Sequence, residues 1–309
     1  MVDVFLQTVP FFAIIGLGYL AGRLGFFPEV ATAYLTRFVF YFALSAMLFQ
    51  FSAKLELAEI LDWNIILAYL AGTTAIYILA TIVALLRRQS VPVAAVEAQC
   101  AVIGNTGFLG IPMLTILMGA EAIGTLMLIL AVDLIVFSSL IVILINGARD
   151  GQFSVRIIAT VAMGLIKNPM IVAMIAGLSW SSMGWGIPVV MNEFLSTLGA
   201  AATPGALFAI GASLASKSTE RMHVAGWLSF CKLILHPLAV TGFALFVFSP
   251  TPYDAGIIIA ASALPVAGNV FMLAQHYGVA PQRVSASILI STVISILTFS
   301  MIVGWATAL

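Results

Sequence analysis

The chain has 309 residues, of which 62% are hydrophobic and only 8% are charged, and its formal net charge is zero. A soluble domain carries about a quarter charged residues, so this composition, with a mean hydropathy of +1.17, excludes a water-covered fold. The neutral balance also gives no basic face for nucleic acid. We therefore expect an all-α integral membrane protein whose outer surface contacts lipid.

The first predicted element is a membrane-spanning helix at the N-terminus. A spanning helix needs about 20 mostly apolar residues, and the run from Val4 to Leu24 satisfies this length. This run is too long for the apolar core of a signal peptide, and Asp3 stands where a basic residue would precede one. Counting such runs along the chain predicts ten spans, at 4–24, 30–52, 63–86, 95–118, 121–146, 157–179, 188–214, 223–248, 254–277 and 283–307.

The ten spans divide into two five-helix repeats, residues 1–146 and 157–309, joined by a cytoplasmic linker at 147–156. An odd number of spans per repeat gives the two halves opposite orientations in the membrane. Lys and Arg gather in the odd-numbered loops, whereas the even-numbered loops hold only Lys54. Because basic loops stay in the cytoplasm, we expect both termini to lie outside it, in a multi-pass protein of the plasma membrane, or of the inner membrane if the source is bacterial.

Two matching interruptions stand in the fourth and ninth spans. The fourth contains GNTGFLGIP, from Gly104 to Pro112, and the ninth contains LPVAGN, from Leu264 to Asn269. Proline inside a helix costs about 3 kcal/mol, and a broken helix persists in lipid only when it is buried in protein or lines a cavity. Matched breaks in both halves therefore favour a binding site over a pair of plain kinks.

A break also exposes the N–H groups of the second half-helix near the bilayer midplane. The positive end of that half-helix attracts an anion, and amide side chains beside it can donate hydrogen bonds. The residues predicted to bind substrate are Asn105, Thr106, Gly107, Pro112, Pro265, Gly268 and Asn269.

At these residues the sequence resembles the auxin efflux carrier family, which includes plant auxin exporters and bacterial malonate-type carriers. The resemblance rests on NTGFLGIP from Asn105, on LPVAGN from Leu264 and on the stretch Pro204–Leu214, and it extends over essentially the whole chain. Lys232–Pro237 also looks like the family. One departure is Ser45, where the family often has proline in the second span, and this makes any inference about the shape of that helix weaker.

The resemblance implies a fold like that of the bile-acid sodium symporters, with the fourth and ninth helices crossing at their breaks. Helices 1, 2, 6 and 7 would form a scaffold that also makes a homodimer. Helices 3–5 and 8–10 would form a transport domain that moves a small organic anion, such as malonate or an auxin-like carboxylate, by an elevator motion. No cofactor or metal is implied, and coupling to H⁺, coupling to Na⁺ and uniport driven by the membrane potential all stay open.

Ionisable residues inside spans are costly and mark functional or structural sites. Asp133 and Lys232 both fall near the middle of their spans, and they either form a structural ion pair or act separately in binding and coupling. His236, directly before Pro237, is a further candidate for coupling, although a packing role is the simpler interpretation. Glu97 is expected to be structural, and Lys167, before Asn168 and Pro169, marks a possible kink.

Other functions fit the sequence less well. The three histidines are scattered without HExxH spacing, and neither a GxSxG nor a Walker sequence occurs, so we do not expect an enzyme. An anion channel and a membrane sensor that binds an anion without moving it remain alternatives. Inverted halves favour alternating access over a channel, and the chain has no soluble output domain for a sensor.

Overall fold

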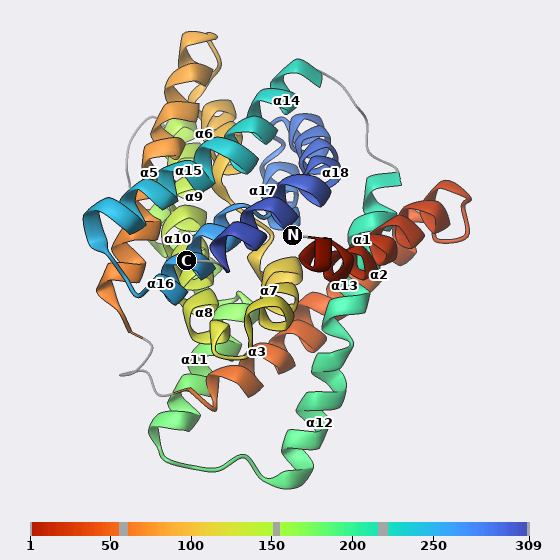
Figure 1. Cartoon of the computed structure of the whole chain (residues 1–309). Helices are drawn as coiled ribbons and strands as arrows, with labels where there is room; N and C mark the ends of the chain where they lie inside the picture. Colours follow the sequence, from red (N-terminus) through yellow and green to blue (C-terminus); the bar gives the residue numbers. More distant parts are fainter. Residues whose placement is uncertain (1, 56–60, 151–154, 216–221, 308–309) are drawn as a thin grey trace.

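The computed structural model describes residues 2–55, 61–150, 155–215 and 222–307, which are helical in every range where a span was predicted (Figure 1). The η segments are single π-helical turns, in which each hydrogen bond spans five residues. The first half contains α1 (Val2–Arg23), α2 (Glu29–Phe38), η1 (Val39–Ala43), α3 (Leu44–Ser52), α5 (Trp63–Leu86), α6 (Val91–Val102), η2 (Thr106–Gly110), α7 (Ile111–Met118), α8 (Ala122–Val132), η3 (Asp133–Phe137) and α9 (Ser138–Asp150).

The second half repeats this mixture of long and interrupted helices. It contains α10 (Val155–Ile166), α11 (Pro169–Ser182), α12 (Val189–Ala200), α13 (Ala202–Ala215), α14 (Met222–Phe230), η4 (Cys231–Leu235), α15 (His236–Phe243), η5 (Ala244–Phe248), α16 (Pro252–Ser262), α17 (Gly268–Tyr277) and α18 (Pro281–Ala306). Several successive helices continue one another end to end, as α2, η1 and α3 do.

Within the described ranges, six helices are long and apolar enough to cross a membrane. They are Glu29–Ser52, Trp63–Leu86, Ala122–Arg149, Val189–Ala215, Met222–Phe248 and Pro281–Ala306. A seventh span is obtained if α10 and α11 count as one, although they bend by 63°. Of the remaining predicted spans, 4–24 is occupied by α1 (Val2–Arg23), whereas 95–118 and 254–277 are occupied by shorter helices because the chain breaks in the middle of each.

The bend between α10 and α11 lies at the kink predicted from Lys167, Asn168 and Pro169. Pro169 is the first residue of α11, and the Asn168 side chain accepts a hydrogen bond from the Met170 N–H at 3.0 Å. Asparagine before a helix and proline at its first position are the residues that favour a helix start. The local sequence therefore ends one helix and begins the next here.

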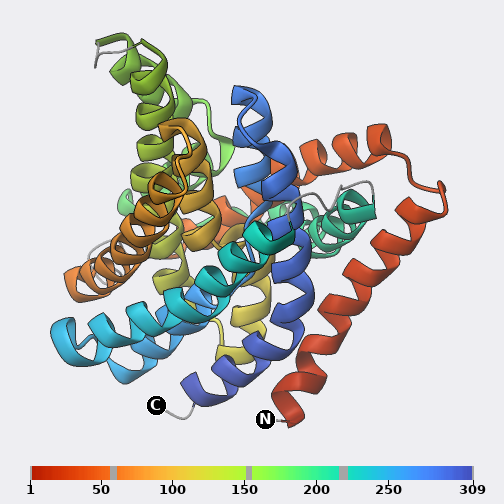
Figure 2. The same cartoon turned by 90° about the horizontal axis from the view of Figure 1, so that it is seen from above.

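Figure 1 shows α3, α11 and α12 in the lower part of the molecule and α1 and α13 at its right-hand side. α5, α15 and α16 lie on the left, and α14 lies at the top. α1 begins and α18 ends at the same edge of the molecule in Figure 2. The two described ends of the chain are thus on one side of the bundle.

Helices α1 and α13 approach so closely that only glycine fits between them. A Cβ atom added at Gly211 would lie 1.9 Å from the carbonyl oxygen of Ile15, and one at Gly18 would lie 2.1 Å from that of Phe208. Helices in lipid associate through van der Waals contact and small residues at the crossing point. This pair is accordingly held backbone to backbone.

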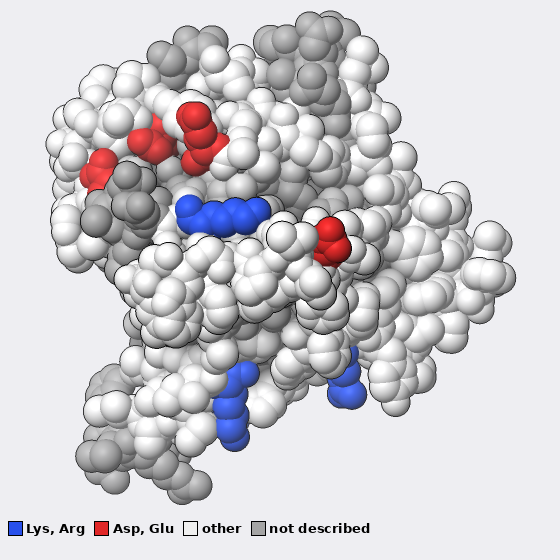
Figure 3. All heavy atoms as spheres, turned by 90° about the horizontal axis from the view of Figure 1, so that it is seen from below, with Lys and Arg blue, Asp and Glu red and all other residues white. Residues whose placement is uncertain are grey.

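The outer surface is mostly uncharged. In Figure 3 the few acidic side chains lie in the upper half of the face, and basic side chains lie at its centre and lower edge. Large apolar side chains point outward, and Phe246 is 84% exposed. A surface of this kind is suited to lipid, which agrees with the all-helical membrane protein expected from composition.

Candidate functional site

The two predicted interruptions lie against each other and pair through their backbones. The Asn105 N–H donates to the Pro265 carbonyl at 2.9 Å, and the Ala267 N–H donates to the Ile103 carbonyl at 3.0 Å. Gly104 and Val266 form an antiparallel bridge between these two bonds. Backbone N–H and C=O groups released by a break have no water to bind in lipid, so each interruption supplies hydrogen-bond partners to the other.

The pairing holds the starts of two half-helices close together. After the first break the chain resumes helix at Thr106, and after the second it resumes at Gly268. The first N–H groups of a helix have no partner within it, and those of Gly268 and Asn269 have no acceptor in the described protein. The paired breaks therefore present backbone N–H groups without an acceptor, together with the positive ends of helix dipoles.

Proline stands two residues after the π turn in three of the five described cases. Pro112 follows η2, Pro237 follows η4 and Pro250 follows η5. Proline has no N–H and its ring crowds the preceding turn, so it disrupts the regular α-helical hydrogen bonding there. π turns are frequent at functional sites. Pro112 is buried and shapes the start of α7, and it lines neither of the two cavities described next.

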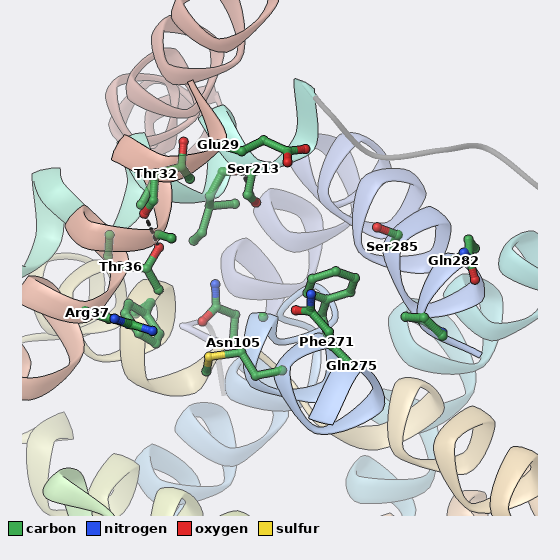
Figure 4. Close-up of a pocket in the computed structure, with 18 residues that line it drawn as sticks. Glu29, Thr32, Thr36, Arg37, Asn105, Ser213, Phe271, Gln275, Gln282 and Ser285 are labelled. Atoms are coloured by element: carbon green, nitrogen blue, oxygen red, sulfur yellow. Dashed lines mark hydrogen bonds between the residues drawn. The ribbon is translucent and has the colours of Figure 1, made fainter. Parts of the chain in front are cut away.

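Two cavities meet at the paired breaks. The smaller has a volume of about 690 Å³ and lies between α2, α13, α17 and the start of α18. The larger, of about 1070 Å³, extends toward α8, η3, α10 and the bend before α11. Arg37, Asn105, Phe108 and Met272 line both. Figure 4 shows the Asn105 amide and the Arg37 guanidinium pointing into the smaller cavity.

The predicted binding residues fall into two sets. Asn105 lines both cavities, Gly268 lines the smaller, and Gly107 and Asn269 line the larger. Thr106 and Pro265 are buried at the paired breaks without lining either cavity. The structure therefore brings these six residues together, four of them on cavity walls and two behind them.

A buried polar network lies behind the breaks. The Lys232 ammonium donates to the Ser262 carbonyl, at the end of α16, and its Nζ lies 3.1 Å from His236 Nδ1. His236 Nε2 in turn lies 3.0 Å from the Thr73 hydroxyl. A Cβ added at Gly104 would lie 3.3 Å from Lys232 Nζ. Lys232 and His236 thus support the paired breaks from behind and line neither cavity.

Asp133 reaches the larger cavity and belongs to a separate contact. Its Oδ1 accepts a hydrogen bond from the Tyr69 hydroxyl at 2.9 Å. Among the described residues, the ion pairs are those of Glu97 with Arg87 and Arg283, so the structure records no ion pair between Asp133 and Lys232. The Tyr69 ring packs edge-on against His236, with centroids 5.8 Å apart, and this contact links Asp133 to Lys232 indirectly.

Three buried oxygen atoms around the breaks have no protein partner in the described ranges: Thr106 Oγ1, Asp133 Oδ2 and Asn269 Oδ1. Buried polar atoms nearly always have a hydrogen-bond partner. Asp133 and Asn269 line the larger cavity, so their polar groups are available to whatever that cavity binds.

Glu97 is a structural residue, as the sequence indicated. Its side chain is fully buried and binds the guanidinium of Arg87 and that of Arg283, the latter at 2.5 Å. It thereby joins α6 to the end of α5 and the start of α18. This ion-pair triad fixes the half-helix that leads into the first break.

The sequence did not single out three residues that the structure brings to the site. Phe108, inside the first motif, stacks on Phe40 with ring centroids 6.4 Å apart. Arg37 is one of the basic residues from which the topology was predicted, and Tyr69 lies within the predicted span 63–86. An aromatic residue between two glycines was a readable signal for Phe108, but nothing local to Tyr69 predicted its bond to Asp133.

Comparison with known proteins gives matches along nearly the whole chain. A family model described as "Membrane transport protein" matches residues 3–303. The "Putative malonate transporter" of Rhizobium meliloti (strain 1021) is 29% identical over 297 residues, which cover 94% of this chain and 92% of that protein. "Auxin efflux carrier component 8" of Arabidopsis thaliana is 22% identical over 94% of both chains. "Uncharacterized transporter YfdV" of Escherichia coli (strain K12) is 26% identical over 92% of both.

Proposed function

The chain belongs to the membrane transport protein family, the family of the auxin efflux carriers, and from this premise we propose that it carries a small organic anion across the membrane. It is an integral, multi-pass membrane protein of a transporter family, not of an enzyme family. The proposed binding site is the pair of facing helix breaks, with Asn105 and Asn269 as donors. The names of its relatives suggest malonate or an auxin-like carboxylate as the anion.

One observation carries this proposal. Two half-helices begin at breaks that are hydrogen-bonded to each other, and both starts border cavities. Each helix start carries a partial positive charge of about half a unit. Two of them, with two amide side chains, offer the donors that a carboxylate needs.

The proposed mechanism is an elevator movement of one group of helices against the other. The scaffold would comprise α1, α2–α3, α10–α11 and α12–α13, and it would also form a homodimer. The transport domain would comprise α5–α9 and α14–α18, with the two broken helices crossing as members of inverted repeats. The close contact of α1 with α13 supports a rigid scaffold, and the Glu97 triad supports a rigid transport domain.

Coupling would use the buried polar groups beside the site. Asp133 lines the larger cavity and holds an oxygen without a protein partner in the described ranges, so it is a candidate for binding H⁺ or Na⁺. Lys232 and His236 would transmit that binding to the breaks. An anion channel and a sensor without transport are the alternatives, and saturable flux with counterflow separates a carrier from both.

Substitution of the two asparagines tests the binding site. Asn105→Ala and Asn269→Ala each remove a donor, and the loss of a hydrogen bond to a charged ligand costs about 1.5–3 kcal/mol, or about a ten- to hundredfold loss of affinity. Isothermal titration of the purified protein with malonate measures this loss. Lys54→Ala is the control, because Lys54 is exposed and lines neither cavity. Unchanged affinity in both folded asparagine variants would remove the breaks from the binding site.

A further inference from the structure

Arg37 lies where the two cavities meet and faces the smaller one together with Asn105 (Figure 4). It belongs to α2, whereas Asn105 belongs to the first break. These two residues, with Phe108 and Met272, are the ones that line both cavities. An anion that lies at the breaks is therefore within the space that Arg37 faces.

The position of Arg37 in its helix gives the guanidinium no structural task. α2 continues through η1 and α3 to Ser52, so Arg37 does not neutralise the exposed carbonyls of a helix end. It forms no ion pair with any described residue. Its guanidinium carbon lies 5.9 Å from the centroid of the Tyr34 ring, and no described residue accepts a hydrogen bond from the guanidinium.

The other charged groups on the cavity walls do not compensate Arg37. In the smaller cavity the other charged residue is Glu29, eight positions earlier on α2 and therefore about 12 Å away along the helix axis at 1.5 Å per residue. In the larger cavity they are Asp133, which is bound by Tyr69, and Lys167; His276 also lines it. Lys167 shares only the larger cavity with Asn105, whereas Arg37 shares both, so Arg37 is the cation that faces Asn105 from either cavity.

We propose that Arg37 binds a second carboxylate of the substrate, so that the protein selects dicarboxylates over monocarboxylates. This inference rests on the proposed function, in which the first carboxylate lies at the helix breaks. Those breaks offer partial charges and amide donors suited to one anionic group, and they leave a second negative charge without a partner. A guanidinium binds a carboxylate through two parallel hydrogen bonds, which an amide or an ammonium group does not reproduce.

The test compares malonate with propanoate, which has the same number of carbons and one carboxylate fewer. Dissociation constants are measured by isothermal titration for the unsubstituted protein and for Arg37→Gln, Arg37→Lys, Lys167→Gln and Arg23→Gln. Arg23 is the matched control, an exposed arginine that lines neither cavity. We expect Arg37→Gln to weaken malonate binding about tenfold or more and propanoate binding by less than about twofold.

The remaining variants sharpen the result. Arg37→Lys keeps the charge but loses the second hydrogen bond, so its malonate affinity should lie between those of the unsubstituted protein and Arg37→Gln. Lys167→Gln and Arg23→Gln should keep the preference for malonate. The inference is wrong if Arg37→Gln weakens both ligands equally or neither, or if Lys167→Gln abolishes the preference instead.

The outcome for the proposed function is read separately. Asn105→Ala should weaken both ligands, because it acts on the carboxylate that they share. If Asn105→Ala and Asn269→Ala leave both affinities unchanged while Arg37→Gln is selective, the proposed site at the breaks is wrong and the role of Arg37 stands. If the unsubstituted protein binds neither carboxylate, the proposed function and the inference are both wrong.

Discussion

Replacement of Glu97 by glutamine should destabilise the protein more than replacement of either arginine that binds it. The Glu97 side chain is fully buried, whereas those of Arg283 and Arg87 are 12% and 33% exposed. Removing one member of a buried ion pair costs about 3–5 kcal/mol, because the other charge is left unpaired. Glu97→Gln leaves the charge of the mostly buried Arg283 unpaired, so we expect the free energy of unfolding to fall by about 3 kcal/mol.

The arginine variants should cost less, in the order of their burial. After Arg283→Gln, Glu97 keeps Arg87 as its partner. After Arg87→Gln it keeps the more buried Arg283, and because Arg87 is the more exposed of the two arginines, solvent screens its charge most and its loss costs least. The predicted order of destabilisation is therefore Glu97→Gln, then Arg283→Gln, then Arg87→Gln.

Thermal unfolding of purified protein measures these costs. Cys100 and Cys231 are free and buried, so a thiol-reactive fluorophore reports unfolding without an added label. At about 2 °C or more per kcal/mol, Glu97→Gln should lower the Tm by about 6 °C. Glu193→Gln, at an exposed site away from any ion pair among the described residues, is the control. A Tm for Glu97→Gln equal to that of the control, or a larger loss in Arg87→Gln, would refute the reasoning.

Two further predictions concern the buried network and the topology. The effects of Asp133→Asn and Tyr69→Phe on the free energy of unfolding should be non-additive, because these side chains share one hydrogen bond. The effects of Asp133→Asn and Lys232→Met should add to within about 1 kcal/mol. Strong coupling in this second double-mutant cycle would mean that the two charges interact directly. A reporter that is active only in the cytoplasm and is fused after Leu309 should be silent, and strong activity would overturn the predicted orientation of both termini.

The sequence predicted the helical membrane fold and the positions of both helix breaks, because each depends on local residue types. Proline, glycine and a helix-starting asparagine interrupt a helix wherever it lies, as at Pro265 and at Asn168. The hydrogen bonds between the two breaks join residues about 160 positions apart, and no local signal specifies such a pairing. Among the candidate site residues, those within the motifs at 104–112 and 264–269 could therefore be predicted most readily from the sequence.

Contacts between side chains of different helices were much less predictable. Asp133 and Lys232 were placed at similar depths by counting residues, but depth alone does not fix which way a side chain points around its helix. The π turns η3 and η4 begin at Asp133 and Cys231 and alter the direction of the side chains near them. Arg37 was assigned to topology because basic residues near loops usually serve that purpose, and only the cavity walls gave it another role.

The pairing of the two breaks uses backbone atoms alone, and this has a consequence for how the family can diverge. Exchange of Asn105 or Ala267 for any residue other than proline keeps the N–H that makes the bond, and every residue at position 265 has the carbonyl. Side chains beside the ligand can therefore change in evolution without loss of the junction that positions them. Relatives that transport different anions can share the same hydrogen-bonded junction of the two breaks and differ only in the side chains around it.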